Sequence, residues 1–153
     1  MSKGTLVCAV LLLCWSQGLA DDCTRFAFGS LRPGLTVTEA FEIRPPTTRI
    51  DSQARDLPLQ AWWSAPPYRT IWIAADDGLV TDVVVEMERD PGFLSDLFRD
   101  WNRVPSHHGA DGFIEQWEWQ VPECGLVAHV ATVENRTVIG LHSVAEGDTD
   151  SGF

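Results

Sequence analysis

Four histidines are the residues of this chain whose type most readily suggests chemistry, and two of them are adjacent in the stretch WNRVPSHHGADGFIEQWEWQ. Neighbouring residues of an extended chain point to opposite sides, so His107 and His108 are poorly placed to share one ion. A zinc site needs three or four ligands, and Asp111 is the only other candidate nearby. His129 and His142 fall in predicted strands, but nothing in their spacing requires them to meet. We therefore predict no metal site and no cofactor, and we interpret SHHGADG as a solvated loop.

One acid is placed where catalysis could use it. Glu115 lies on the predicted apolar face of its strand, and a buried acid there could be catalytic. Pairing with an arginine at the end of a strand is the simpler explanation. The sequence has no G-x-S-x-G, no H-E-x-x-H and no phosphate-binding glycine loop. We predict that the protein is not an enzyme, with a hydrolase that uses Glu115 and the histidines as an alternative.

The stretch QAWWSAPPYR is the stronger functional candidate. Trp62 and Trp63 must point to opposite sides of a strand, so they cannot both enter one core. Tryptophan, tyrosine and arginine are typical anchors of protein interfaces, which adds Tyr68 and Arg69 to the predicted binding patch. The alternative is that the second tryptophan lies under a hydrophobic layer formed by residues 44–57.

The first twenty residues resemble a secretory signal. A short cationic start at Lys3 leads into an apolar run, and small residues end at Ala20 as in a cleavage site. The run is too short to span a bilayer, so we predict no membrane insertion. The predicted domains are a signal peptide (1–20), one folded domain (21–144) and a disordered acidic tail (145–153). The predicted location is periplasmic or secreted.

Two cysteines would survive cleavage of the signal, Cys23 and Cys124. Outside the cytosol such a pair most simply forms a disulfide, with two free thiols as the alternative. The chain also carries a formal net charge of −11. An acidic surface disfavours nucleic acid and anionic membranes and favours a basic partner, although solubility alone could also explain the charge.

The sequence pattern predicts two helices and several strands. A capping box formed by Thr36 and Glu39 begins one helix, and Asp90 precedes a proline at the start of the other. Asp77-Gly78 suits a type I′ hairpin turn, and residues 134–136 mark a second hairpin. The predicted helices begin near residues 37 and 91, the predicted strands span about residues 57–64, 68–76, 79–88, 113–121, 126–133 and 137–144, and residues 44–57 and 106–112 are predicted loops.

Each predicted helix precedes three predicted strands, which suggests an α-βββ pseudo-repeat with Trp63 and Trp119 in comparable places. The simplest architecture is an α+β fold, an antiparallel sheet with two helices packed on one face. Alternation places Leu79, with Thr81, on the apolar face of one strand, and Phe113 on the apolar face of another.

The stretches LRPGLTVTEAFEI and TIWIAADDGLVTDVVVEME resemble a family of small bacterial envelope proteins. These are the SmpA/OmlA outer-membrane assembly lipoproteins and the similarly built β-lactamase inhibitor proteins. Gly34-Leu35-Thr36 is similar to the family's Gly-Met-Thr at a helix start, and Asp77-Gly78 matches its hairpin turn. The lipidated cysteine is lacking, and RPP stands where the family has L-G-x-P. The resemblance implies a non-catalytic protein that binds another protein through its sheet or loops.

These observations give one main functional hypothesis and one alternative. The main hypothesis is an exported protein-binding module for envelope assembly or scaffolding. The alternative is an inhibitor or immunity protein directed against a basic secreted enzyme such as a lysozyme. The partner in both cases is another protein, and the sequence does not indicate an oligomeric state.

Overall fold

The computed structural model describes residues 23–50, 59–64 and 66–144. The predicted signal peptide and acidic tail lie outside these residues. The described elements are two α-helices, one 3-10 helix and eight strands. In chain order they are α2 (Val37–Ile43), β1 (Thr48–Ile50), β2 (Leu59–Trp63), β3 (Thr70–Asp76), β4 (Leu79–Glu88), α3 (Pro91–Trp101), β5 (His107–Asp111), β6 (Ile114–Val121), η2 (Pro122–Cys124), β7 (Leu126–Val133) and β8 (Arg136–Ser143).

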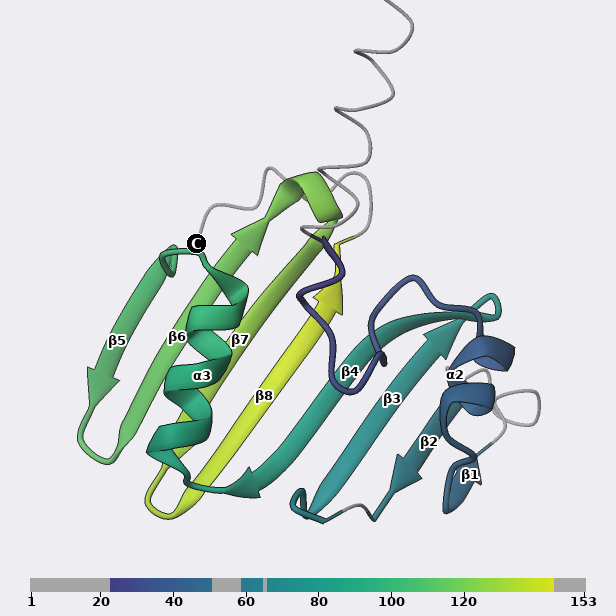
Figure 1. The fold of residues 1–153 in the computed structure, drawn as a ribbon, viewed down its shortest axis with the longest axis horizontal. Helices are drawn as coiled ribbons and strands as arrows, with labels where there is room; N and C mark the ends of the chain where they lie inside the picture. Colours follow the sequence, from purple (N-terminus) through teal and green to yellow (C-terminus); the bar gives the residue numbers. More distant parts are fainter. Residues whose placement is uncertain (1–22, 51–58, 65, 145–153) are drawn as a thin grey trace, which may run out of the picture.

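The eight strands form one antiparallel sheet in the order β1-β2-β3-β4-β8-β7-β6-β5. Each helix is followed by a four-stranded meander, and the last strands of the two meanders, β4 and β8, pair at the centre (Figure 1). The predicted α+β class with an antiparallel sheet is therefore confirmed. Each helix precedes four strands rather than the three expected, and the repeat itself stays a prediction.

One face of the sheet, here called the inner face, carries the hydrophobic core. Its central side chains lie in register across six strands, with buried valine and isoleucine in the middle and a tryptophan at each end. The aromatic side chains of the helices contact inner-face residues. Phe98 and Trp101 of α3 lie 5.0 and 4.8 Å from the ring of Trp119, and Phe41 of α2 lies 6.4 Å from Trp63.

The helix starts follow from local sequence. Thr36 Oγ1 accepts a hydrogen bond from the backbone N–H of Glu39, and the Glu39 carboxylate accepts one from the backbone N–H of Thr36, as a capping box requires. Asp90 caps α3 by accepting from the two N–H groups of Gly92 and Phe93. Both predicted helix starts are confirmed.

The helix ends are held to the sheet by two tryptophans. Trp63 Nε1 donates to the carbonyl of Arg44, just after α2, and Trp119 Nε1 donates to the carbonyl of Arg103, just after α3. The distances are 3.0 and 2.9 Å. Each buried indole thus has its one polar atom satisfied while its ring fills the core.

Two predicted loops are wrong, because each contains an edge strand. β1 lies within residues 44–57, and β5 lies within residues 106–112. Each pairs with a neighbour on one side only, and most of its residues are exposed on both faces. Such strands need no alternation of apolar and polar residues, and charged or polar side chains protect their free edges.

Two predicted orientations are also wrong. The pairing of β3 with β4 shifts between Ala74 and Ala75, which leaves Thr81 without a partner in the register. This bulge reverses the alternation, so Val80 is buried while Leu79 is 48% exposed. Phe113 is not an inner-face residue, because it lies in the turn between β5 and β6 and is 85% exposed.

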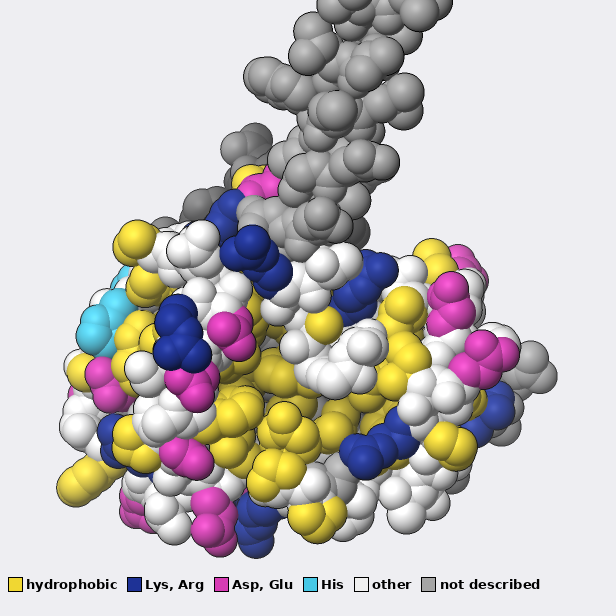
Figure 2. Space-filling view, in the orientation of Figure 1, with side chains coloured by type: hydrophobic (Ala, Val, Ile, Leu, Met, Phe, Trp, Pro, Cys, Tyr) yellow, Lys and Arg dark blue, Asp and Glu magenta, His cyan; other side chains and the backbone are white. Residues whose placement is uncertain are grey.

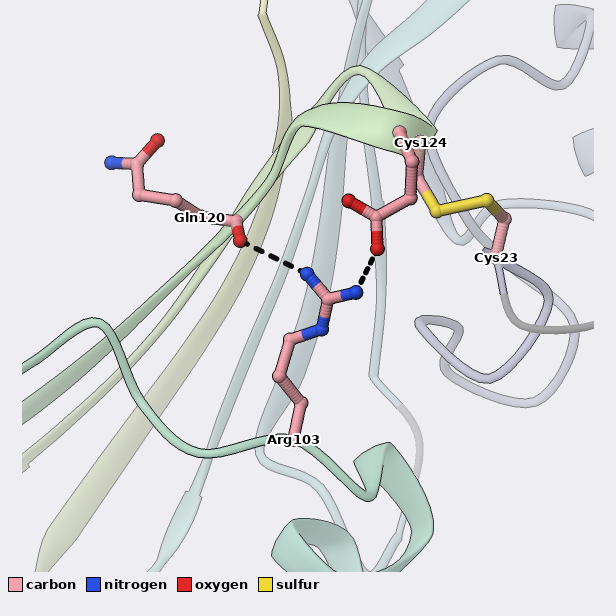
Figure 3. Close-up of a disulfide and its surroundings, with 5 residues drawn as sticks. Cys23, Arg103, Gln120 and Cys124 are labelled. Atoms are coloured by element: carbon pink, nitrogen blue, oxygen red, sulfur yellow. Dashed lines mark hydrogen bonds and ion pairs between the residues drawn. A yellow bond between two sulfur atoms is a disulfide. The ribbon is translucent and has the colours of Figure 1, made fainter. Parts of the chain in front are cut away.

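The predicted disulfide between Cys23 and Cys124 is present and joins the N-terminal segment to η2 (Figure 3). Arg103, from the segment after α3, reaches the same region. Its guanidinium donates to the carbonyl of Gln120 at 3.2 Å and forms an ion pair with Glu123. No described helix is both long enough and apolar enough to cross a membrane.

Candidate functional site

The face opposite the core, here called the outer face, carries the candidate site. Its large side chains are half-exposed along the central strands, whereas the inner-face side chains beside them are buried. The cross-strand register places one row of residues side by side over six strands, namely Trp62, Trp72, Val84, Gly140, His129 and Glu118. This row passes from aromatic to ionisable side chains.

The aromatic end of the row forms a shallow hollow. Trp62 of β2 is the direct cross-strand neighbour of Trp72 of β3, which in turn faces Val84 of β4. These three residues line a hollow of about 310 Å³ together with Thr70 and Glu86. We call it the tryptophan hollow. It offers two flat apolar surfaces with a hydroxyl and a carboxylate beside them.

The ionisable end contains a hydrogen-bonded chain from three strands. The Asp82 carboxylate of β4 accepts from Nδ1 of His142 in β8 at 2.5 Å. Nε2 of His142 lies 3.0 Å from Nδ1 of His129 in β7, and the two rings are nearly parallel at 7°. The Thr81 hydroxyl donates to the other oxygen of Asp82 at 2.7 Å. We call His129 and His142 the histidine pair.

Gly140 lies directly beneath the histidine pair and explains how the rings can approach the sheet. A Cβ at this position would lie 2.3 Å from Cε1 of His129 and 2.6 Å from Nε2 of His142. Real Cβ atoms essentially never make contacts this short. Glycine is therefore required here for close approach of the side chains above it.

Protonation within the chain is set by its surroundings. The hydrogen bond from His142 lowers the pKa of Asp82, and the Thr81 hydroxyl lowers it further against the opposing effect of burial. Burial and the nearby His142 lower the pKa of His129, while Glu118 opposes that change. At neutral pH, Asp82 is therefore an acceptor only, and Nδ1 of His142 carries a proton.

The arrangement can hold a proton at a defined nitrogen on a solvent-accessible face. An aspartate that orients a histidine is also found in hydrolytic sites, where the histidine activates a hydroxyl or thiol. In the part of the chain that the structure describes, no hydroxyl or thiol forms a hydrogen bond with His129 or His142. No described group of three His, Cys, Asp or Glu side chains is placed to hold a metal ion.

The two tryptophans of the predicted binding patch lie on opposite faces. Trp63 is 2% exposed and belongs to the core, whereas Trp62 lies half-exposed on the outer face. Trp72, which no sequence pattern marked as a binding residue, lies beside Trp62.

The other two residues of that patch, adjacent in the chain, contact different parts of the molecule. Tyr68 packs edge-on against Phe93 of α3 with ring centroids 6.2 Å apart. Arg69 is exposed, and its guanidinium lies 3.8 Å from the Glu86 carboxylate, which Arg136 also approaches at 3.7 Å. Of the four predicted residues, Trp62 lines the tryptophan hollow and Arg69 pairs with its Glu86, whereas Trp63 is in the core and Tyr68 packs against α3.

A second apolar surface lies on the helix side of the molecule. Figure 2 shows hydrophobic side chains gathered between α3 and α2 in the middle of the view. A hollow of about 300 Å³ is found in this part of the molecule, and we call it the inter-helix hollow. It is lined by Phe28, Gly29, Leu31, Ile43, Arg44, Tyr68 and Ile71.

His108 and Glu115 form a cluster with Trp117 and Arg89 near the edge of the sheet. His108 Nε2 lies 3.1 Å from the Glu115 carboxylate, and its ring stacks on Trp117. Glu115 also faces Arg89 at 3.8 Å. His107 is exposed on the outer face opposite Glu118. Glu115 is thus half-buried and paired with an arginine.

The sequence did contain a signal for the histidine pair. A two-residue turn at residues 134–135 fixes the register of the hairpin, which places His129 opposite Gly140 and His142 opposite Val127. The two histidines are then diagonal neighbours on one face.

Comparisons with protein-family models, curated proteins and solved structures found no match for this chain. Its function is therefore inferred from the residues of the outer face.

Proposed function

We propose that this protein is a non-catalytic, exported module that binds another protein with the outer face of its sheet. The observation that carries the proposal is the tryptophan hollow, where Trp62 and Trp72 lie next to each other and stay partly exposed. Tryptophans in a hollow of an otherwise polar surface are the residues from which protein interfaces draw most of their affinity. Export is supported by the signal-like sequence and by the disulfide between Cys23 and Cys124.

The favoured partner is a basic protein. The chain has a formal net charge of −11. On the outer face itself, Asp82 and Glu118 flank the histidine pair, and each is directed to the same surface by the register. A cationic partner would be attracted over long range and then held by apolar contact with the two tryptophans.

We further infer that the two halves of the sheet are variants of one helix-and-meander unit whose helices cover the inner face. Trp62 and Glu118 each accept a backbone hydrogen bond from the segment that follows a helix. Their cross-strand neighbours are Trp72 and His129. Matching backbone positions thus carry an aromatic surface in one half and an ionisable surface in the other. This supports one binding face with an apolar part and a charged part.

The proposal is tested with Trp62→Ala and Trp72→Ala in the disulfide-bonded protein. The probe is a panel of cationic secreted proteins that includes a lysozyme, with affinity measured by calorimetry at low and high salt. Each substitution should weaken binding by about tenfold or more, since interface tryptophans typically contribute above about 1 kcal/mol. Phe113→Ala is the matched control, because Phe113 is an exposed aromatic residue outside the tryptophan hollow. It should bind like the wild type.

The same measurement distinguishes the outer face from the inter-helix hollow. Ile43→Asp places a charge in that hollow without touching the outer face. If Ile43→Asp abolishes binding while Trp62→Ala and Trp72→Ala do not, the outer-face proposal is wrong. Equal binding by all variants would contradict it as well.

An inhibitor of a basic secreted enzyme is the second candidate function. It is favoured by the carboxylates of Asp82 and Glu118, which lie on the same face of the sheet as the tryptophan hollow, since a cationic active-site rim could meet both features. An inhibitor must lower the activity of the enzyme that it binds, whereas a scaffold leaves that activity unchanged. Enzyme assays at saturating concentrations of this protein separate the two functions.

A further inference from the structure

We propose that the histidine pair is a proton-controlled contact of the outer face. The pair stays joined while it carries no more than one extra proton, and uptake of a second proton separates the two rings. The link to partner release rests on the proposed function, because it takes the outer face as the binding surface. The ring separation itself requires no partner.

The hydrogen-bond chemistry of the chain limits how many protons it can hold. An ionised Asp82 can only accept, so Nδ1 of His142 must donate to it. The remaining nitrogen of His142 lies 3.0 Å from Nδ1 of His129, and one of the two must accept. A neutral pair satisfies this requirement, and so does a pair with one extra proton. Two imidazolium rings carry a proton on every nitrogen, so the bond between them must break.

The charges around the pair come from several strands. Asp82 faces it from β4 and Glu118 from β6, where Glu118 is the cross-strand neighbour of His129. Glu86 lies farther along the same face of β4, and His107 lies opposite Glu118 in β5. The two nearest carboxylates favour the first extra proton. The second must be added next to an existing positive charge.

Separation of the rings would change the binding surface. The rings lie over Gly140, whose direct neighbour on the other side is Val84 of the tryptophan hollow. Movement of either ring alters the surface next to Val84. Two positive charges between Asp82 and Glu118 would also neutralise the carboxylates that attract a basic partner. Acidification should therefore release the partner.

The first test uses the intact protein alone. The imidazole nitrogen and carbon shifts of the histidines are followed by NMR from about pH 8 to about pH 4, where histidine and carboxyl groups titrate. His129 should take up its proton below pH 6.5, the ordinary value. The methyl signals of Val84 should shift with the second protonation step.

Variants separate this proposal from ordinary titration. His129→Gln or His142→Gln should abolish the shift of Val84, and Asp82→Asn should change the titration of both histidines. His107→Gln is the control, because His107 lies on the same face and should leave the response unchanged. Two histidines that titrate independently, or a Val84 response that persists in His129→Gln, would overturn the proposal. His129→Gln alone suffices if His142→Gln does not fold.

The second test uses whichever cationic protein binds in the tryptophan experiment. Its affinity for the wild type should fall at least tenfold between neutral and mildly acidic pH, and the fall should be much smaller for His129→Gln. An equal fall for both proteins would contradict the link to partner release. If no cationic protein binds, the proposed function fails, and the NMR titration still decides whether the histidine pair separates.

Discussion

Gly140 is the residue on which the geometry of the histidine pair depends most directly. Gly140→Ala should lower the free energy of unfolding by about 1–3 kcal/mol, because the new methyl group overlaps both rings and forces them out of place. Chemical denaturation measures the change. In a His129→Ala background the same substitution should cost much less, because the closest contact is then absent. Equal costs in the two backgrounds would show that the rings do not lie over Gly140.

The lowered pKa values of His129 and Asp82 predict two separate acid transitions in stability. The fold favours neutral His129, so the unfolded chain binds a proton at this imidazole more readily than the folded chain does. The free energy of unfolding therefore falls as the pH drops below 6.5. The fold favours ionised Asp82, so its contribution is present above pH 3.8 and is lost as pH falls through the lower folded pKa.

Unfolding curves measured across this pH range check both transitions. His129→Gln should reduce the fall in the free energy of unfolding that begins near pH 6.5. Asp82→Asn should reduce the fall below pH 3.8. His107→Gln should change neither. A wild type whose stability stays constant from neutral pH down to pH 3.8 would contradict the contribution assigned to His129.

At the scale of elements, the N-cap of α3 gives a direct prediction. Asp90→Ala removes the carboxylate that accepts from the first N–H groups of the helix, so the free energy of unfolding should fall by about 1 kcal/mol. Thermal denaturation followed by circular dichroism measures the loss. Asp96→Ala is the matched control, since Asp96 lies on the exposed side of the helix and only pairs with Arg99. A larger loss for Asp96→Ala would be inconsistent with the cap.

Elements that obey a local rule could be predicted from sequence, and those set by their neighbours could not. The helix starts at Thr36 and Asp90 and the turn at Asp77-Gly78 each depend on a few adjacent residues. The edge strands β1 and β5 have little apolar pattern, because only pairing with β2 and β6 makes them strands. The exposed Leu79 follows from a bulge, which residue alternation does not reveal.

The candidate site was predictable to a smaller extent. The sequence required Trp62 and Trp63 to lie on opposite sides, and the structure places Trp63 in the core. The sequence did not indicate that Trp72 lies beside Trp62, because the residues between the two strands do not fix the register in which the strands pair. Asp82 meets His142 only because β4 pairs with β8, a contact between residues 60 apart in the chain. Such long-range pairing has no local signal.

At the scale of the whole molecule, the disulfide is the strongest single constraint. Cys23 and Cys124 are 101 residues apart, so replacing both with serine should lower the free energy of unfolding by about 4–5 kcal/mol in the chain-entropy account. Denaturation of the oxidised wild type and of the double variant measures the difference. Adding a reductant should destabilise the wild type and leave the double variant unchanged. Equal stability of oxidised and reduced wild type would contradict this prediction.

The pairing of β4 with β8 has a consequence for how the molecule is made. Each four-stranded half forms from contacts close in the chain. The β4 edge of the first half, however, has no strand to pair with until residues 136–143 have emerged. Among the strand pairings, β4 with β8 joins the residues farthest apart in the chain, so it should be the slowest pairing to form. During synthesis, β4 would therefore lack its partner on this side until β8 has been made.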